Sequence, residues 1–484
     1  MSKSTSLQSA PLLAIAVACC LVLAGCAVGP DYQRPATPAP ATLTRSDLGL
    51  ASTGSAHVDA RWWQALGSAQ LDALIQEALD HSPTIEAAEA TLRAAHQNVI
   101  AQRGYFFPSV AAGYNPTRQN TGQTMSPALD SGQRIYTYHT AQLSVSYAPD
   151  LFGGNRRQVE GLVATEQEQR LQLQAARLSL AANLAGAVIQ SAMLQEQARL
   201  TREAIDAAEQ QLAHMRKLQA NGYASGLDVA TQQTLLLQLQ QSLPPLLKSL
   251  EQTRNLTATL LARTPDAAPP VPALSSFTLP ALPEAVASRL VEQRPDIRVA
   301  ETQVQQASAA VGVATAARLP QLSLTAAYGG GATTLGRMFS SGNIIWSLGA
   351  GLLQPLFDGG TLKARQGAAQ EQLHASAAQY QATVLSAFQD VANALYAVDA
   401  DRQALRMSEQ SAQASGDTYR LTHSQFSQGY AGKPALLAAE QSRLQAEAAV
   451  VAARGSLLGD TIAVYQALGG GVLEDGAATQ ARAD

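Results

Sequence analysis

Histidines, glycines and lysines that could do chemistry are present in this 484-residue sequence, but their spacing matches no catalytic or metal-binding motif. The seven histidines are scattered, and no His-Glu-x-x-His pair occurs among them. Gly329-Gly330-Gly331 lacks the spaced glycine of a dinucleotide turn, and Gly432-Lys433-Pro434 lacks the residues that flank a phosphate loop. We therefore expect no enzyme, no catalytic residues and no metal site, and we interpret the glycine triplet as an external loop.

The cysteines indicate one chemical step, the attachment of lipid. Cys19, Cys20 and Cys26 all lie near the N-terminus, which excludes a disulfide framework or a multi-cysteine metal site in the body of the chain. A short apolar run ends in Leu23-Ala24-Gly25-Cys26, similar to a bacterial lipobox. We expect residues 1–25 to be a signal peptide and Cys26 to carry a lipid, with no other cofactor. A hydrophobic signal with a chance cysteine is the alternative.

The residue after the cysteine indicates the membrane to which the protein is sorted, and the prolines that follow indicate a linker. Ala27 stands where an Asp would retain a bacterial lipoprotein in the inner membrane, so the usual sorting pattern predicts the outer membrane. Pro30, Pro35 and Pro38 indicate an extended linker within the lipidated segment 26–62.

Charge and composition narrow the class of protein. The chain has 33 Lys+Arg against 37 Asp+Glu, so it lacks the basic surface that a nucleic-acid partner requires. Charged residues make up 14% and aromatic residues 5%, and the richness in Ala, Leu and Gln favours long helices packed on other helices. After the signal peptide we find no run of the roughly 18–20 apolar residues that a transmembrane helix needs.

The chain contains two copies of one unit. Residues 82–110 align without gaps on residues 294–322, with matching Pro83/Pro295 and Pro108/Pro320. The predicted divisions are a first repeat at 63–264, a proline-rich seam at 265–283, a second repeat at 284–470 and a C-terminal tail at 471–484.

Each repeat contains two segments that alternate with a period of two, as Leu143, Val145 and Tyr147 do between polar neighbours. A soluble sandwich sheet would show the same alternation. Few charges and lengths of about 9–11 residues favour membrane strands. The strands are predicted at about 108–115, 138–149, 319–329 and 344–356.

The remaining pattern is helical. Two segments, about 156–219 and 363–427, carry heptad spacing and would each extend roughly 95 Å. Such spacing predicts coiled-coil packing against partner helices, and an amphipathic helix on a globular core is the alternative. Shorter helices are predicted at about 70–104, 226–262, 284–317 and 433–468. In the second of these, Pro244-Pro245 predicts a break or kink.

Strand number constrains the assembly. Four strands cannot close a barrel, and an open sheet in lipid leaves edge groups unpaired at several kcal/mol each. If the strands lie in a membrane, the barrel is shared, with eight strands in a dimer and twelve in a trimer. Only twelve would leave a lumen.

Together these motifs resemble the TolC/OprM family of outer-membrane efflux channels, in its lipoprotein (NodT-like) branch of RND-type tripartite systems. The resemblance covers the mature chain. It implies a mainly α fold with membrane β-strands, in which long helical hairpins form a trimeric α-barrel and four strands per chain contribute to a shared 12-stranded β-barrel. It places the proline-rich seam in an equatorial domain. The matching pieces are Cys26 to Pro35, Trp63, Leu71 to Ile75, Arg294 to Ile297, Pro355 to Gly360 and Gly429-Tyr430.

The resemblance also implies a function. We expect an exit channel that passes small molecules from the periplasm to the exterior, working with a periplasmic adaptor protein and an inner-membrane RND-type transporter. A lipid-anchored periplasmic adaptor and a structural coiled-coil lipoprotein are the alternatives, although an adaptor would have a single hairpin and a coiled coil would need no strands. The sequence does not identify the substrates.

Function should then depend on the hairpin tips. Relatives often carry carboxylates just after the second tip, whereas this chain has Pro434 to Ala438 with no Asp. Leu436 and Leu437 are our first candidates for the gate, with Asp228 and Glu440 second. Asp228 could instead cap its helix. The tips, where the adaptor should dock, are predicted at Gly222, Tyr223, Gly226, Gly429, Tyr430 and Gly432.

Overall fold

The computed structural model describes residues 27–36, 59–120, 134–280 and 293–471. The predicted signal peptide, Cys26, much of the linker and nearly all of the C-terminal tail lie outside these residues. The described chain forms two compact units. Unit 1 combines the described parts of Met1–Pro35, Leu92–Gln169 and Ala300–Tyr380, and unit 2 those of Ala36–Thr91, Arg170–Val299 and Gln381–Asp484.

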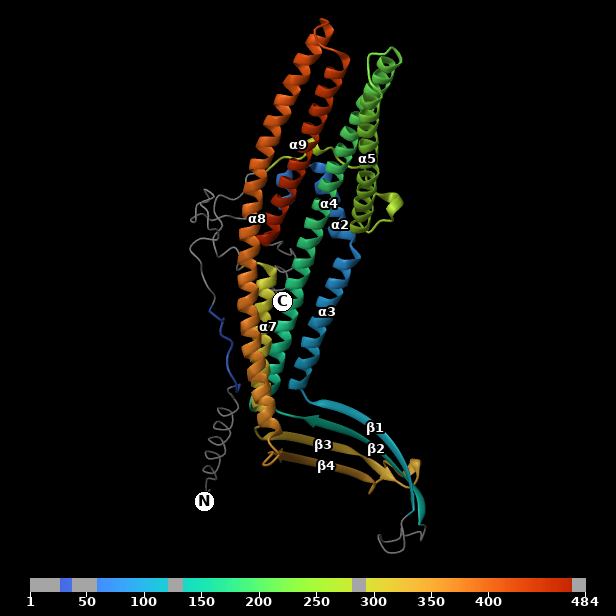
Figure 1. The fold of residues 1–484 in the computed structure, drawn as a ribbon. Helices are drawn as coiled ribbons and strands as arrows, with labels where there is room; N and C mark the ends of the chain where they lie inside the picture. Colours follow the sequence, from blue (N-terminus) through green and yellow to red (C-terminus); the bar gives the residue numbers. More distant parts are fainter. Residues whose placement is uncertain (1–26, 37–58, 121–133, 281–292, 472–484) are drawn as a thin grey trace, which may run out of the picture. The chain divides into compact units, whose positions relative to one another are not determined.

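Unit 1 contains an antiparallel sheet whose strands follow one another in the order β1-β2-β3-β4. Figure 1 shows this sheet as a curved ribbon. The middle pair, β2 and β3, joins the first repeat to the second, and within the described chain β1 and β4 are edges with one neighbour each. The four predicted strands are thus present, at β1 Ser109–Asn120, β2 Ile135–Tyr147, β3 Gln321–Ala332 and β4 Ile344–Leu353.

Two long helices follow the strand pairs, α4 at Gly154–Ala220 and α8 at Thr361–Ser427, each close to its predicted bounds. Many of their heptad positions are buried, such as Leu184 at 0% exposure and Val391 at 1%, and others are half-buried in the single chain. Ala and Leu at these heptad positions allow close contact between neighbouring helices, so a chain with few aromatic residues can form such long helices.

The first short helical segment is divided in two, with α2 at Ala69–His81 and α3 at Pro83–Arg103. Ser82 between them has an extended backbone, with ψ at 122°. Proline disfavours the helical conformation in the residue before it and fits the first turn of the next helix, so Pro83 ends one helix and starts the other.

The other short helices are α5 at Gly226–Leu260, α7 at Pro295–Ala316 and α9 at Lys433–Ala467. The sequence predicts a break or a kink in α5 at Pro244-Pro245, and the break is absent because the helix continues through both prolines. Each proline leaves a carbonyl four residues earlier without its helical donor. Gln240 and Gln241, which carry those carbonyls, are exposed in the chain, so water can reach them.

Two helices, α4 and α9, contain a window long and apolar enough to cross a membrane by composition, which we did not expect from the sequence. The described chain buries 61% of the window in α4 and 39% of that in α9. Burial against other helices accounts for much of their apolar character, so composition is weak evidence for a helical span.

Unit 2 has an aromatic core next to the helix ends. The indole of Trp62 stacks on Tyr465 with ring centroids 5.3 Å apart, and Trp63 is perpendicular to it at 5.9 Å. Trp63 Nε1 donates to Asp72 at 2.7 Å, which satisfies the polar edge of a buried ring. Trp62 and Trp63 lie in the short 3₁₀ helix Trp62–Leu66.

Candidate functional site

One face of the sheet in unit 1 is apolar and exposed. The register pairs Leu143 with Tyr328 and Tyr328 with Trp346, and residues directly opposite one another share a face. Trp346 is 74% exposed and Leu348 is 80% exposed. On a soluble sheet a group of such apolar side chains would be covered by other parts of the protein. The face is formed by Val110, Ala112, Tyr114, Leu143, Val145, Tyr147, Leu324, Ala326, Tyr328, Trp346, Leu348, Ala350 and Leu352.

The opposite face carries small and polar side chains, such as Ser144, Thr325 and Ser347. In a membrane barrel, the side chains of each strand alternate between apolar ones that face the lipid and polar ones that face the water inside. The structure therefore supports the interpretation of these segments as membrane strands.

Aromatic and apolar residues also flank the sheet, and the sequence analysis assigned them no role at a membrane surface, although Leu356 and Phe357 lie in a segment that matches the family. Tyr105 and Phe107, just before β1, are 69% and 71% exposed, and Leu356 and Phe357, just after β4, are 93% and 92% exposed. Aromatic side chains at strand ends are typical of the girdle where a barrel meets the membrane surface. Their position in the sequence, immediately outside the alternating segments, is the signal that could have identified them as girdle residues.

The glycine triplet does not form the predicted external loop. Gly329, Gly330 and Gly331 lie inside β3 and are buried. A Cβ on Gly330 would lie 2.1 Å from the carbonyl oxygen of Met338, in the β3–β4 connection. Gly330 therefore allows the backbone of the β3–β4 connection to lie directly against β3.

The first hairpin tip, between α4 and α5, contains a glycine in the left-handed conformation. Gly222 has φ +77°, and its N–H donates to Gln219 while that of Tyr223 donates to Leu218 at 2.9 Å. This pair of bonds is the Schellman motif, which satisfies the last carbonyls of a helix. Tyr223 is 83% exposed beyond it.

Asp228 belongs to the cap of α5. Its Oδ2 accepts from the Ser225 backbone N–H at 2.8 Å, and the Asp228 N–H donates to the Ser225 hydroxyl at 3.1 Å. The hydrogen bonds from the Ser225 N–H and hydroxyl lower the pKa of Asp228 below its ordinary value. This capping box is the alternative that the sequence left open for Asp228.

The second tip, between α8 and α9, repeats the motif. Gly429 has φ +80°, and the Tyr430 N–H donates to Gln425 at 2.8 Å. Gly432 precedes α9 without a side-chain cap, and Lys433 Nζ lies 5.7 Å from the ring centre of Phe426. The tips thus expose Tyr223 and Tyr430, and Gly226 and Gly432 lie where α5 and α9 begin.

The structure does not favour Leu436 and Leu437 as pore-lining residues. They are 7% and 1% exposed in the single chain. A pore constriction needs side chains that leave the core of their own chain, whereas these two belong to that core. Glu440 is half-buried, with no hydrogen bond or ion pair among the described residues.

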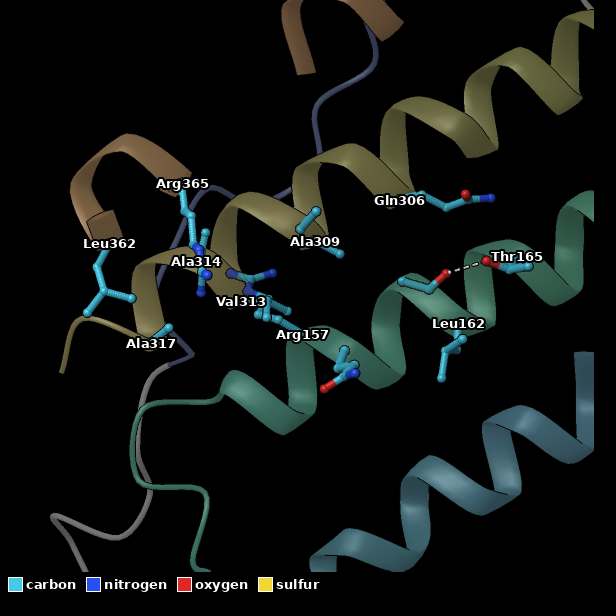
Figure 2. A pocket seen from close by; sticks show the side chains of 13 residues that line it. Arg157, Leu162, Thr165, Gln306, Ala309, Val313, Ala314, Ala317, Leu362 and Arg365 are labelled. Atoms are coloured by element: carbon cyan, nitrogen blue, oxygen red, sulfur yellow. Dashed lines mark hydrogen bonds between the residues drawn. The ribbon is translucent and has the colours of Figure 1, made fainter. Parts of the chain in front are cut away.

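The described residues contain no group of three or more His, Cys, Asp or Glu side chains arranged to hold a metal. A hollow of about 490 Å³ lies in unit 1 between α4, α7 and the start of α8. Figure 2 shows Arg157 and Arg365 beside Val313, Ala314 and Ala317 of its apolar wall. The lining brings together no acid–base pair or ligand set.

The profile of the family described as "Outer membrane efflux protein" matches residues 74–263 and 286–470 of this chain, one match for each repeat. The chain belongs to the outer membrane efflux protein family. It is 32% identical to the pyoverdine export outer membrane protein OpmQ of Pseudomonas putida, over 87% of this chain and 90% of that protein. It is 31% identical to the probable efflux pump outer membrane protein TtgC of the same organism, over 96% of each.

Solved structures of efflux channels share the fold. The MtrE outer membrane channel of Neisseria gonorrhoeae superposes with a TM-score of 0.81 at 28% identity, covering 93% of this chain and 99% of that one. The outer-membrane channel OprN gives a TM-score of 0.80 at 28% identity, over 92% and 99%. This efflux protein is therefore an outer-membrane channel component with membrane strands and a large helical, periplasmic portion.

Proposed function

We propose that three copies of the chain form the exit duct of a tripartite efflux pump, fed by a periplasmic adaptor and an inner-membrane RND-type transporter. The observation that carries this proposal is the exposed apolar face of an open four-stranded sheet. Three such sheets, joined edge to edge, give twelve strands and a water-filled lumen. A periplasmic adaptor or a structural coiled coil would not account for that face.

In this proposal, small molecules move through the lumen of the duct and no catalytic step is needed. The described residues show no catalytic or metal constellation, and the sheet face opposite the lipid is lined by small polar side chains that stay wetted. The proposed cargo is whatever small toxic compounds the inner-membrane transporter delivers. The proposed anchor is a lipid on Cys26, with no other cofactor.

The tips are the proposed docking region for the adaptor, because they expose Tyr223, Leu227 and Tyr430 on two turns of the same geometry. Opening requires a partner that binds the open form better than the closed one. Of the four predicted gate residues, Glu440 now stands first, since it alone is neither buried in the core nor engaged as a cap.

Deletion of the gene tests the proposal in cells. We expect the deletion strain to accumulate fluorescent pump substrates and to recover when the gene is restored. A tagged chain should co-purify with an adaptor protein after chemical crosslinking. Unchanged sensitivity to all pump substrates tested, with no adaptor recovered, would overturn the efflux role.

A further inference from the structure

Residues 27–35, which we call the strap, lie on unit 1 and form neither helix nor strand. The prolines in this part of the sequence predict an extended linker, which would act as a spacer and need not pack on the helices. In the structure the strap instead contacts helices α4, α7 and α8.

The backbone of the strap is hydrogen-bonded at successive points. The Val28 N–H donates to the carbonyl of Phe152 at 3.1 Å, just before α4. Ser308 of α7 donates its hydroxyl to the carbonyl of Pro30 at 3.3 Å. Bonds to two elements distant in sequence fix both the position and the direction of the segment.

Two glycines allow the strap to lie directly on α7. Gly29 has φ +99°, and a Cβ placed on it would lie 2.4 Å from the Cα of Gly312. A Cβ on Gly312 would lie 3.0 Å from the Val28 carbonyl oxygen and 2.7 Å from Cγ of Arg157. The contact thus requires a residue without a side chain on both partners.

Arg157 of α4 contacts the strap next to this pair of glycines. Its guanidinium donates to the carbonyls of Val28 and Gly29 at 3.1 and 3.4 Å and to Asp31 at 2.8 Å. Glu160 on the next turn accepts at 2.8 Å. Arg157 is only 5% exposed, so its buried charge depends on these acceptors, three of which belong to the strap and one, Glu160, to α4 itself.

Further along, the strap reaches α7 and α8. The Tyr32 hydroxyl donates to Glu301 at 2.9 Å, and burial together with Glu301 raises the pKa of Tyr32 well above its ordinary value. Arg34 Nε donates to the hydroxyl of Tyr380 at 3.1 Å. Tyr380 is fully buried, so the strap ends on a core residue of α8.

We propose that the strap is a structural staple that locks α4, α7 and α8 of unit 1 together, and is not a flexible tether. The staple uses the polar acceptors of the strap to satisfy Arg157 and the glycine pair to bring backbone onto helix. The attachment point of the proposed lipid, Cys26, is one residue away in sequence. Any role in holding that lipid rests on the proposed function.

Hydrogen exchange tests the staple in the mature, full-length protein in lipid nanodiscs. We expect the amide of Val28, whose N–H is bonded to the Phe152 carbonyl, to exchange at least about tenfold more slowly than in an unstructured peptide. Gly312→Ala should remove that protection and lower the melting temperature. Gly367→Ala is the matched control, because Gly367 also lies in a helix but its Cβ would meet nothing within 4 Å. It should leave the strap protected.

A strap that exchanges at the unstructured rate in the parent protein would overturn the staple. So would full protection in Gly312→Ala. If that variant does not fold, Asp31→Asn provides the test, with a several-fold faster strap exchange expected. Asp417→Asn, which removes a surface carboxylate paired with Arg420 at 3.0 Å, is its control. Intact mass tests the lipid separately, so an unmodified Cys26 with a protected strap would contradict the anchor and support the staple.

Discussion

Arg294 is buried where the start of α7 meets α8 and α9 in unit 2. Its guanidinium donates to the Ala467 carbonyl at 2.9 Å, to Asp390 at 3.1 Å and to Asp296 at 2.8 Å. The motif Arg294-Pro295-Asp296-Ile297 was visible in the sequence as part of the repeat. Its role as a junction between three helices depends on contacts distant in sequence, which spacing alone cannot show.

We expect Arg294→Met to lower the free energy of unfolding by about 2 kcal/mol, because it leaves the Ala467 carbonyl without its donor and the half-exposed carboxylates of Asp296 and Asp390 without their shared cation. Thermal melting followed by circular dichroism measures the loss. Arg263→Met is the control, since Arg263 pairs with Glu77 at a partly exposed position and should cost less than about 1 kcal/mol. Equal losses in the two variants would contradict the junction role.

The capping box at Asp228 makes a prediction about pH. Since hydrogen bonds from Ser225 lower the pKa of Asp228, its stabilising effect is present above the ordinary Asp pKa and is lost as pH falls through the lowered value. Asp228→Asn should therefore melt at a lower temperature than the parent at pH 7. The difference should begin to shrink near pH 4, the ordinary Asp pKa, and disappear only below the lowered pKa of the folded state. A difference that persists in acid would indicate another origin.

Glu440 makes a prediction about ion selectivity. If three copies of this half-buried carboxylate face the lumen, Glu440→Gln should reduce cation preference, measured as the reversal potential across planar bilayers under a salt gradient. Glu86→Gln, in the first turn of α3, should leave the reversal potential unchanged. Identical potentials for parent and Glu440→Gln would place the gate elsewhere.

Periodicity alone showed where the elements lie but not how each residue is used. Alternation revealed the strands and heptads revealed α4 and α8, because both patterns are local. Leu437 is apolar whether it faces a pore or its own core, so only packing could distinguish them. The strap was hidden for the same reason: Gly29 and Gly312 acquire meaning only when they touch.

The two faces of β4 provide a test at the level of one strand. Leu348 and Ser347 are adjacent but point to opposite faces. Leu348→Lys should cost about 2–4 kcal/mol near the membrane midplane and reduce the amount of folded protein in outer-membrane fractions. Ser347→Lys, facing the wetted side, should fold at near-parental levels. Equal yields of the two variants would contradict the membrane assignment of the sheet.

The chain as a whole leaves two strand edges unpaired in the described structure, β1 and β4. In lipid each unpaired backbone group costs several kcal/mol, so the sheet is stable there only when other chains cover its edges. One assembly, in which three chains complete a single channel, then accounts for the exposed apolar face and the two hairpin tips. It also agrees with the family to which the chain belongs.

The subunit number in detergent tests that assembly most directly. Light scattering corrected for bound detergent should give three chains per particle for the protein extracted from outer membranes. Three chains would supply the twelve strands that a lumen requires. A stable, folded monomer would contradict the shared barrel and, with it, the proposed exit duct.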